Sequence, residues 1–176
     1  MKEKILLRKT CSVYANDLHF ATVIFPFVTK EIEEGATIKT IFEKNEKENI
    51  EKIIKNVGLN SDIKEQVRKI DWNITNINKI KNIFKMLEFE IKQKDKVDLI
   101  VLGRNSFMQK VNKLIDLWIK NNIEKLEKRK ITINVVNCFA FAENKKFDNI
   151  LDNHDYLLKT EGIEEIIREE EFLKAN

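Results

Sequence analysis

The stretch VDLIVLG, residues 97–103, decides the fold class. It is an almost unbroken apolar run in which Asp98 carries the only charge, and it is too short to form a helix. Strands of this composition are typically buried on both faces, in a parallel sheet that helices cover on either side. We therefore predict a central parallel strand here. The loop after it, residues 103–106, should face the crevice in which open α/β sheets bind ligands.

Strand-like and helix-like segments alternate along the rest of the chain. Further strands are predicted at residues 10–14, 37–42, 69–73 and 130–141, the last of them near an edge of the sheet or running beyond it. Helices are predicted at residues 18–34, 46–56, 60–68, 77–92, 107–121 and 163–174. The alternation implies right-handed crossovers. The predicted fold is a single α/β domain, a three-layer sandwich with a mostly parallel central sheet and a core over about residues 10–165.

The first predicted helix carries clear signals at both of its ends. Asn16 or Asp17 can cap its start by accepting hydrogen bonds from free backbone amides. Gly35 can end it in a left-handed conformation. Pro26 lies inside the apolar pattern, where we expect it to kink the helix or to interrupt it for one turn.

Composition and charge exclude several classes of protein. Cys11 and Cys138 are isolated within predicted strands, so we expect buried thiols in a reducing, cytoplasmic setting. There is no apolar run of membrane-spanning length and no pattern of a signal peptide at the N-terminus. The net charge is only +3, with 32 basic and 29 acidic residues intermixed, which argues against nucleic acid as the main partner.

The loops after the predicted strands collect polar and aromatic side chains that could hold a small ligand by hydrogen bonds and stacking. The candidate ligand-binding residues are Tyr14, Asn16, Asp17, His19, Glu43, Trp72, Arg104 and Asn105, with Lys44, Asn45, Asn73 and Glu143 in the same loops. His19 and Glu43 could also act as a base and its orienting carboxylate, although a single His on an apolar helix start is more often structural. The histidines, His19 and His154, have no metal-ligand spacing, so no metal and no cofactor are expected.

A phosphate-binding loop is missing from the place where a nucleotide-binding α/β protein carries one. Such a loop needs glycines, a Lys and a Ser or Thr. The segment YANDLHFA, residues 14–21, has none of these, and Asp17 would repel a phosphate. The predicted central strand also ends in Gly103, where a nucleoside triphosphatase would have an Asp for magnesium water.

The order of these units nevertheless resembles the RecA/KaiC-like ATPase core. VDLIVLG is similar to the Walker B strand, and Glu43 falls on the position of the catalytic acid, while both phosphate-site motifs are absent. Among degenerate members, the chain is similar to the MEDS sensory domain of DcmR-type regulators. The similarity rests on Tyr14, Glu34-Gly35, Glu43, and a late segment with Cys138, Phe147 and His154, but the His that the family has before the Tyr is absent. The resemblance implies a sensory or regulatory module rather than a turnover enzyme.

We therefore expect a non-catalytic regulatory domain that binds a small-molecule ligand or a regulatory protein partner at the former nucleotide crevice. The alternatives are a pure protein-interaction module whose crevice is filled by its own side chains, and a small hydrolase or nucleotide-binding enzyme that uses Glu43 and His19. The predicted C-terminal helix, residues 163–174, is amphipathic and acidic. It can dock on the core or form a surface for a partner or a second copy in a homodimer.

Overall fold

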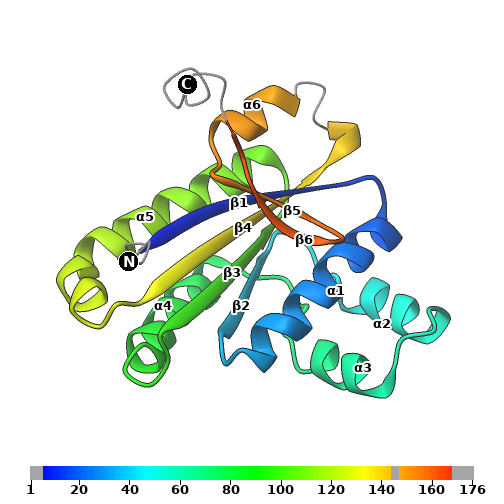
Figure 1. Cartoon of the computed structure of the whole chain (residues 1–176), viewed down its shortest axis with the longest axis horizontal. Helices are drawn as coiled ribbons and strands as arrows, with labels where there is room; N and C mark the ends of the chain where they lie inside the picture. The colour runs from blue at the N-terminus through cyan, green and yellow to red at the C-terminus, as the bar shows by residue number, and fades with distance from the viewer. Residues whose placement is uncertain (1–5, 144–146, 168–176) are drawn as a thin grey trace.

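The computed structural model describes residues 6–143 and 147–167, which form an α/β fold around one six-stranded sheet (Figure 1). The strands follow the spatial order β2-β3-β4-β1-β5-β6, and all pairs are parallel except β5 with β6. The strands are β1 (Leu7–Tyr14), β2 (Thr37–Phe42), β3 (Lys96–Leu102), β4 (Thr132–Ala140), β5 (Tyr156–Lys159) and β6 (Gly162–Glu165). The predicted mostly parallel sheet is confirmed.

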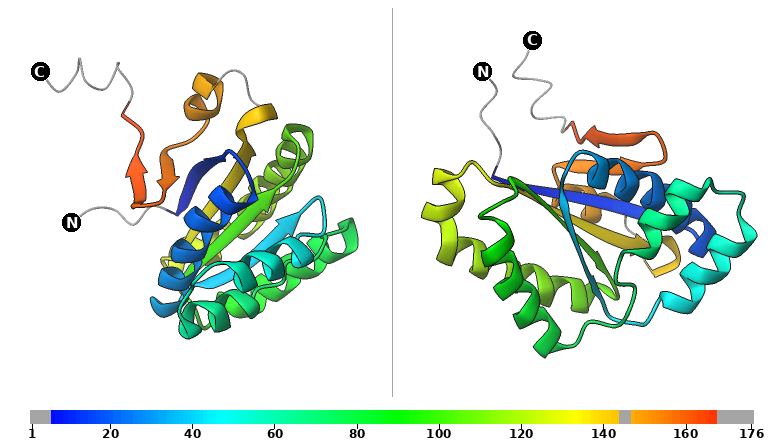
Figure 2. Two further views of the ribbon diagram at one scale, coloured as in Figure 1. Left: turned by 90° about the vertical axis from the view of Figure 1, so that its right-hand side faces the viewer. Right: turned by 90° about the horizontal axis from the view of Figure 1, so that it is seen from below.

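Helices lie on both faces of the sheet, as the two side views show (Figure 2). They are α1 (Asp17–Glu33), α2 (Lys47–Asn56), α3 (Ser61–Arg68), α4 (Ile77–Glu90), α5 (Asn105–Lys128) and α6 (Phe147–Asp152), and a 3-10 turn, η1, spans Phe141–Glu143. One apolar cluster joins α1, α2 and α3 to one face of the sheet. A second cluster joins α4 and α5 to the other face. The predicted three-layer sandwich is therefore present.

Strand β3 is the interior strand that the sequence predicts. It pairs with β2 over six positions, from Thr37↔Val97 to Phe42↔Leu102, and with β4 along its whole length. Every residue from Val97 to Leu102 is buried. Ile100 and Leu102 pack toward α1, while Leu99 and Val101 pack toward α4 and α5. The continuous apolar run follows from this, because both faces of the strand are covered.

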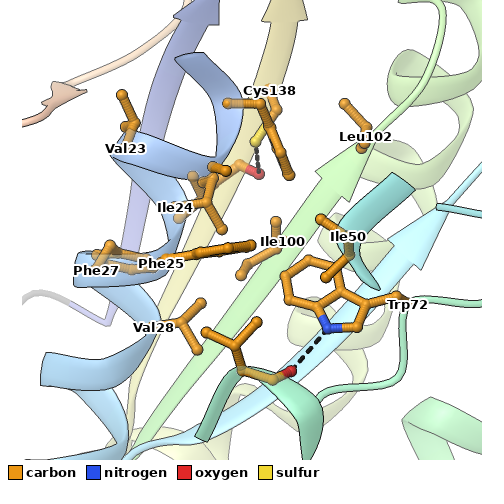
Figure 3. Packing of buried hydrophobic residues seen from close by; sticks show 14 of the residues in the cluster. Val23, Ile24, Phe25, Phe27, Val28, Ile50, Trp72, Ile100, Leu102 and Cys138 are labelled. Atoms are coloured by element: carbon orange, nitrogen blue, oxygen red, sulfur yellow. Dashed lines mark hydrogen bonds between the residues drawn. The ribbon is translucent and has the colours of Figure 1, made fainter. Parts of the chain in front are cut away.

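Helix α1 packs its apolar side tightly against the sheet (Figure 3). Asn16 caps its start by accepting a hydrogen bond from His19 N at 2.9 Å. Gly35, at φ +83°, follows its end, as predicted. Pro26 does not interrupt the helix. Its side chain is exposed, so the helix carbonyl that loses its amide partner faces water, while the neighbouring Phe25 and Phe27 hold this turn on the sheet.

The strand predicted at residues 69–73 is wrong. This segment belongs to the irregular connection between α3 and α4, and Trp72 turns into the core instead of extending a sheet. Asp71 accepts hydrogen bonds from the backbone N–H and side-chain amide of Asn73, which bends the chain locally. Thr75 N then donates to Phe42 O at 2.9 Å. The segment thus runs past the end of β2 without pairing as a strand.

The C-terminal predictions also need correction. Residues 162–165, assigned in part to an acidic helix from Ile163, form β6, which pairs antiparallel with β5 after a turn containing Gly162 at φ +133°. Residues 166 and 167 of that predicted helix are irregular, and residues 168–174 lie outside the described residues. Helix α6 and strand β5 were not predicted. Strand β4, expected near an edge, lies inside the sheet between β3 and β1.

The sequence predicts two buried thiols and no membrane-spanning segment. Cys11 and Cys138 are free and buried, as predicted, and burial raises the pKa of Cys11 to about 11. Both thiols are therefore protonated at neutral pH and packed as small apolar groups. Among the described residues, no helix combines the length and the apolar character needed to cross a membrane.

Truncation of β3 should expose how strongly the fold depends on it. We expect Leu99→Ala and Val101→Ala each to lower the free energy of unfolding by about 2–4 kcal/mol, because α4, α5 and the neighbouring strands cannot close the cavity. Urea denaturation measures the loss. The control is Lys94→Ala at an exposed position, which should change it by less than about 0.5 kcal/mol. Losses below about 1 kcal/mol at both β3 positions would contradict the doubly covered strand.

Candidate functional site

Glu43 and Arg104 meet at the carboxyl edge of the sheet, one after β2 and the other after β3. Glu43 Oε1 accepts hydrogen bonds from Arg104 Nε at 2.9 Å and from Arg104 Nη2 at 2.6 Å, and Glu43 Oε2 accepts from Arg104 N at 2.7 Å. These bonds to Arg104 hold the pKa of Glu43 below its ordinary value. A carboxylate that is ionised and bonded through both oxygens is a poor general base.

Gly103 makes this pairing possible by its lack of a side chain. A Cβ at this position would lie 2.6 Å from Phe107 Cδ1 and 2.8 Å from Glu43 Cβ, both closer than van der Waals contact allows. The glycine at the end of β3 is thus explained by the close approach of Glu43. Gly103 stands where the resemblance to ATPases leads us to expect a magnesium-binding Asp. The Glu43–Arg104 ion pair lies beside this position.

The candidates around the start of α1 serve the local structure. His19 Nδ1 accepts a hydrogen bond from Ala15 N at 3.0 Å, and Asn16 is the helix cap. Tyr14 packs edge-on against Phe20, with 5.4 Å between ring centroids, and burial raises the pKa of its hydroxyl. Asp17 is exposed in the first helical turn, where its charge suits the helix dipole. His19 Nδ1 accepts from Ala15 N, and Glu43 Oε2 accepts from Arg104 N. Neither atom is therefore available for a hydrogen bond that would join His19 to Glu43 as a catalytic base and its orienting carboxylate.

Trp72 belongs to the core, and not to a ligand-binding surface (Figure 3). Only 4% of it is exposed, it stacks on Phe42 with 5.7 Å between ring centroids, and its Nε1 donates to Val67 O at 2.8 Å. Its hydrogen bond and its ring face are both used internally. Trp72, one of the eight predicted ligand-binding residues, therefore offers no ring face to a ligand.

A different cleft, of about 900 Å³, opens beside the carboxyl end of β4, between the first turns of α5 and helix α6. We call it the α5–α6 cleft. Its lining comprises Lys9, Asn105, Met108, Gln109, Asn112, Asn137, Phe139, Ala142, Glu143, Asn149, Ile150, Asp152, Asn153 and His154. Of the predicted ligand-binding residues, Asn105 lies here, together with Glu143 from the same group of loops. The cleft is of the size that small-molecule sites usually have.

A hydrogen-bonded network of side chains forms the base of the α5–α6 cleft. Asn112 Nδ2, on α5, donates to Asn137 Oδ1 at 2.8 Å and to Met108 O at 2.7 Å. Asn137 Nδ2, on β4, lies 3.1 Å from His154 Nε2. His154 Nδ1 lies 2.6 Å from Ile150 O, on α6. One chain of bonds thus connects the helix, the strand and α6, and it fixes the relative position of the cleft's two walls.

The network also fixes the tautomer and the protonation state of His154. A backbone carbonyl can only accept, so Nδ1 carries the proton that bonds Ile150 O, and Nε2 accepts from Asn137. Burial holds the pKa of His154 below its ordinary value, which keeps the ring neutral. Phe139 packs edge-on against this ring at 5.6 Å between centroids. His154 therefore has a structural role, since it links β4 to α6 in the wall of the cleft. Among the described residues, no cluster of three or more His, Cys, Asp or Glu is suited to a metal ion.

Sequence reasoning missed Asn137 and Asn112, although one signal for them exists. Asn137 interrupts the apolar run VVNCF inside a strand predicted to be buried, and a buried amide must find hydrogen-bond partners. Its partner could not be chosen from sequence. Asn112 is one of many polar residues on α5, and only the fold brings it to Asn137.

No protein-family model matches the chain, and no curated protein matches it either. The chain is therefore defined by its architecture: a three-layer α/β domain with a mostly parallel sheet. Its particular features are the Glu43–Arg104 pair at the carboxyl edge and the open α5–α6 cleft beside it.

Adding a methyl group at the end of β3 tests the close approach of Glu43. We expect Gly103→Ala to lower the free energy of unfolding by about 1–3 kcal/mol, since the new Cβ forces Glu43 and Phe107 apart. Gly58→Ala is the matched control, because a Cβ there meets nothing within 4 Å and the substitution should be neutral or stabilising by up to about 1 kcal/mol. Equal effects in chemical denaturation would show that the packing at Gly103 is loose.

Proposed function

We propose that this chain is a non-catalytic regulatory domain that binds a small polar molecule in the α5–α6 cleft. The observation that carries the proposal is the cleft itself, which remains open and keeps a defined shape through the Asn112–Asn137–His154 network. Pre-formed clefts that combine apolar surface with a few polar groups are typical ligand sites. Met108 and Phe139 supply apolar surface here, and carboxamide side chains supply most of the polar surface.

The groups available in the cleft favour recognition over chemistry. Carboxamides donate and accept hydrogen bonds but do not take up or release protons at neutral pH. His154 is buried and uses both ring nitrogens internally, so it offers no free base. Ligand binding without turnover agrees with the resemblance to a degenerate ATPase-like sensory domain, and a cytoplasmic setting agrees with the free thiols.

The structure offers a route from the cleft to the far edge of the sheet. Helix α6 forms one wall, His154 follows it, and β5 and β6 come next along the chain. Asp155 N donates to Lys9 O at 2.8 Å, and Ile166 N donates to Asp155 O at 2.8 Å, so the hairpin is tied to the same turn as His154. A ligand that bridges α5 and α6 would favour one placement of α6, and the β5–β6 hairpin would follow as a population shift.

A cleft-filling substitution tests the site. Gln109→Trp places a large ring in the cleft, and Lys110→Trp places the same ring on the next residue of α5, outside the lining. Each protein is dialysed to equilibrium against a small-molecule extract of cells, and bound compounds are identified by mass spectrometry. We expect a compound enriched by the wild type and by Lys110→Trp, and at least tenfold less by Gln109→Trp. Equal enrichment by all three proteins, or none by any, would remove the α5–α6 cleft as the ligand site.

Binding of ATP with magnesium provides a separate test. We expect no heat of binding in calorimetry up to millimolar ATP, because the segment after β1 lacks the amide cradle, the Lys and the Ser or Thr that hold phosphates. Glu43, the carboxylate that approaches the end of β3, is also engaged through both of its oxygens by Arg104. Affinity in the micromolar range would restore a nucleotide-binding enzyme and would contradict a degenerate phosphate site.

A further inference from the structure

A row of buried polar side chains crosses the face of the sheet under the C-terminal half of α1. Thr10 Oγ1, on β1, donates to Asn134 Oδ1, on β4, at 2.7 Å. Asn134 Nδ2 then donates to Asp98 Oδ1, on β3, at 2.9 Å. All three side chains are buried. One oxygen of Asp98 is thus satisfied by a neutral donor, and the row ends on a carboxyl group inside the core.

The second oxygen of Asp98 has no such donor. Asp98 Oδ2 is buried without a hydrogen-bond partner among the described residues, while the carboxyl group of Glu31, on α1, lies within hydrogen-bonding reach of Asp98. Glu31 is itself buried. Two ionised carboxylates can only accept hydrogen bonds and repel each other. A proton between them supplies the missing donor.

The charges around this pair do not remove the need for that proton. Lys96 Nζ contacts Glu31 Oε2 and lies 3.4 Å from Glu34 Oε2, so one ammonium group serves the carboxylates of α1. On the neighbouring strands, Asp98 is in register with Ile38 of β2 and Asn134 of β4, both uncharged. Arg8, on β1, has its guanidinium over the ring of Tyr156, with 5.3 Å from Cζ to the centroid. Glu34 also has Lys30 Nζ 3.9 Å from its Oε1, so among the described residues Lys96 is the one close cation that Asp98 and Glu31 share.

We propose that Asp98 and Glu31 share a single proton, which ties α1 to the sheet and is released as the pH rises. With the proton in place, Asp98 donates to Glu31, Glu31 keeps its ion pair with Lys96, and Asn134 keeps its bond to Asp98. After its release to solvent, two buried carboxylates face each other across the contact between α1 and β3. The C-terminal half of α1 then packs less firmly on the sheet.

The direction of the pH effect follows from where the proton binds. Burial, and then the charge of Glu31, raise the pKa of Asp98 to about 7. In the unfolded chain an Asp titrates near 4, so between about pH 4 and pH 7 the folded protein holds a proton that the unfolded chain has lost. The folded state is therefore favoured at the acid end of this window, and the advantage is lost as the pH rises through the pKa of folded Asp98.

The substitution Asp98→Asn tests the proton directly. An amide can still accept from Asn134 and can donate to Glu31, but it does not titrate. We expect the unfolding equilibrium constant of the wild type to increase with pH, relative to that of Asp98→Asn, by up to about tenfold per pH unit between pH 5 and pH 7. Burial lowers the pKa of His154, which changes stability with pH in the opposite direction, and the difference between the two proteins cancels its contribution. Parallel pH profiles would overturn the proposal.

Two measurements on the unsubstituted protein keep the proposal testable if Asp98→Asn does not fold. The carboxyl carbon-13 resonance of Asp98 should report a protonated group at pH 6, and an ionised group at pH 5 and above would overturn the shared proton. Amide hydrogen exchange, corrected for its intrinsic pH dependence, should speed up at residues 27–33 of α1 above pH 8 relative to α5. No change in that ratio would overturn the link to helix packing.

Discussion

The covering of β3 on both of its faces and both of its edges is the constraint on which the rest of the structure depends. Its side chains reach α1 on one side and α4 and α5 on the other, and its backbone bonds β2 and β4. A strand in this position has no exposed side on which to place polar groups. Asp98 is the exception, and it is accommodated by a row of hydrogen bonds across three strands. The carboxyl end of β3 then fixes where Glu43 and Arg104 meet.

Much of the fold could be predicted from the sequence because burial on both faces leaves a simple apolar pattern. The pattern over residues 97–103 was sufficient for β3, and helical periodicity with an Asn cap and Gly35 was sufficient for α1. The prediction of a strand at residues 69–73 failed because the apolar side chain of Trp72 fills the core from a loop and does not belong to a strand. The β5–β6 hairpin was missed because its strands are only four residues long and β6 is mostly exposed, so they show little alternation.

The candidate site was harder to predict than the fold. Loops at the carboxyl ends of parallel strands were the predicted region, and two of their residues, Asn105 and Glu143, line the proposed α5–α6 cleft. The sequence alone could not show that Glu43 forms an ion pair with Arg104, or that His19 Nδ1 accepts a hydrogen bond from Ala15 N. Both outcomes depend on local geometry of a few ångströms. The most informative polar residue, Asn137, was hidden inside an apolar strand, since its meaning depends on Asn112 and His154 from distant segments.

The ion pair at the end of β3 and the α5–α6 cleft are two distinct features of the carboxyl edge of the sheet. Glu43 and Arg104 neutralise each other at the end of β3, and Gly103 gives that pair its room. The α5–α6 cleft lies beside this ion pair, and its network consists of Asn112, Asn137 and the neutral ring of His154. Neutral amides hold their geometry over a wide pH range because they do not titrate. At and above neutral pH, where His154 also stays neutral, the cleft can therefore keep its shape while the carboxyl pair under α1 loses its proton.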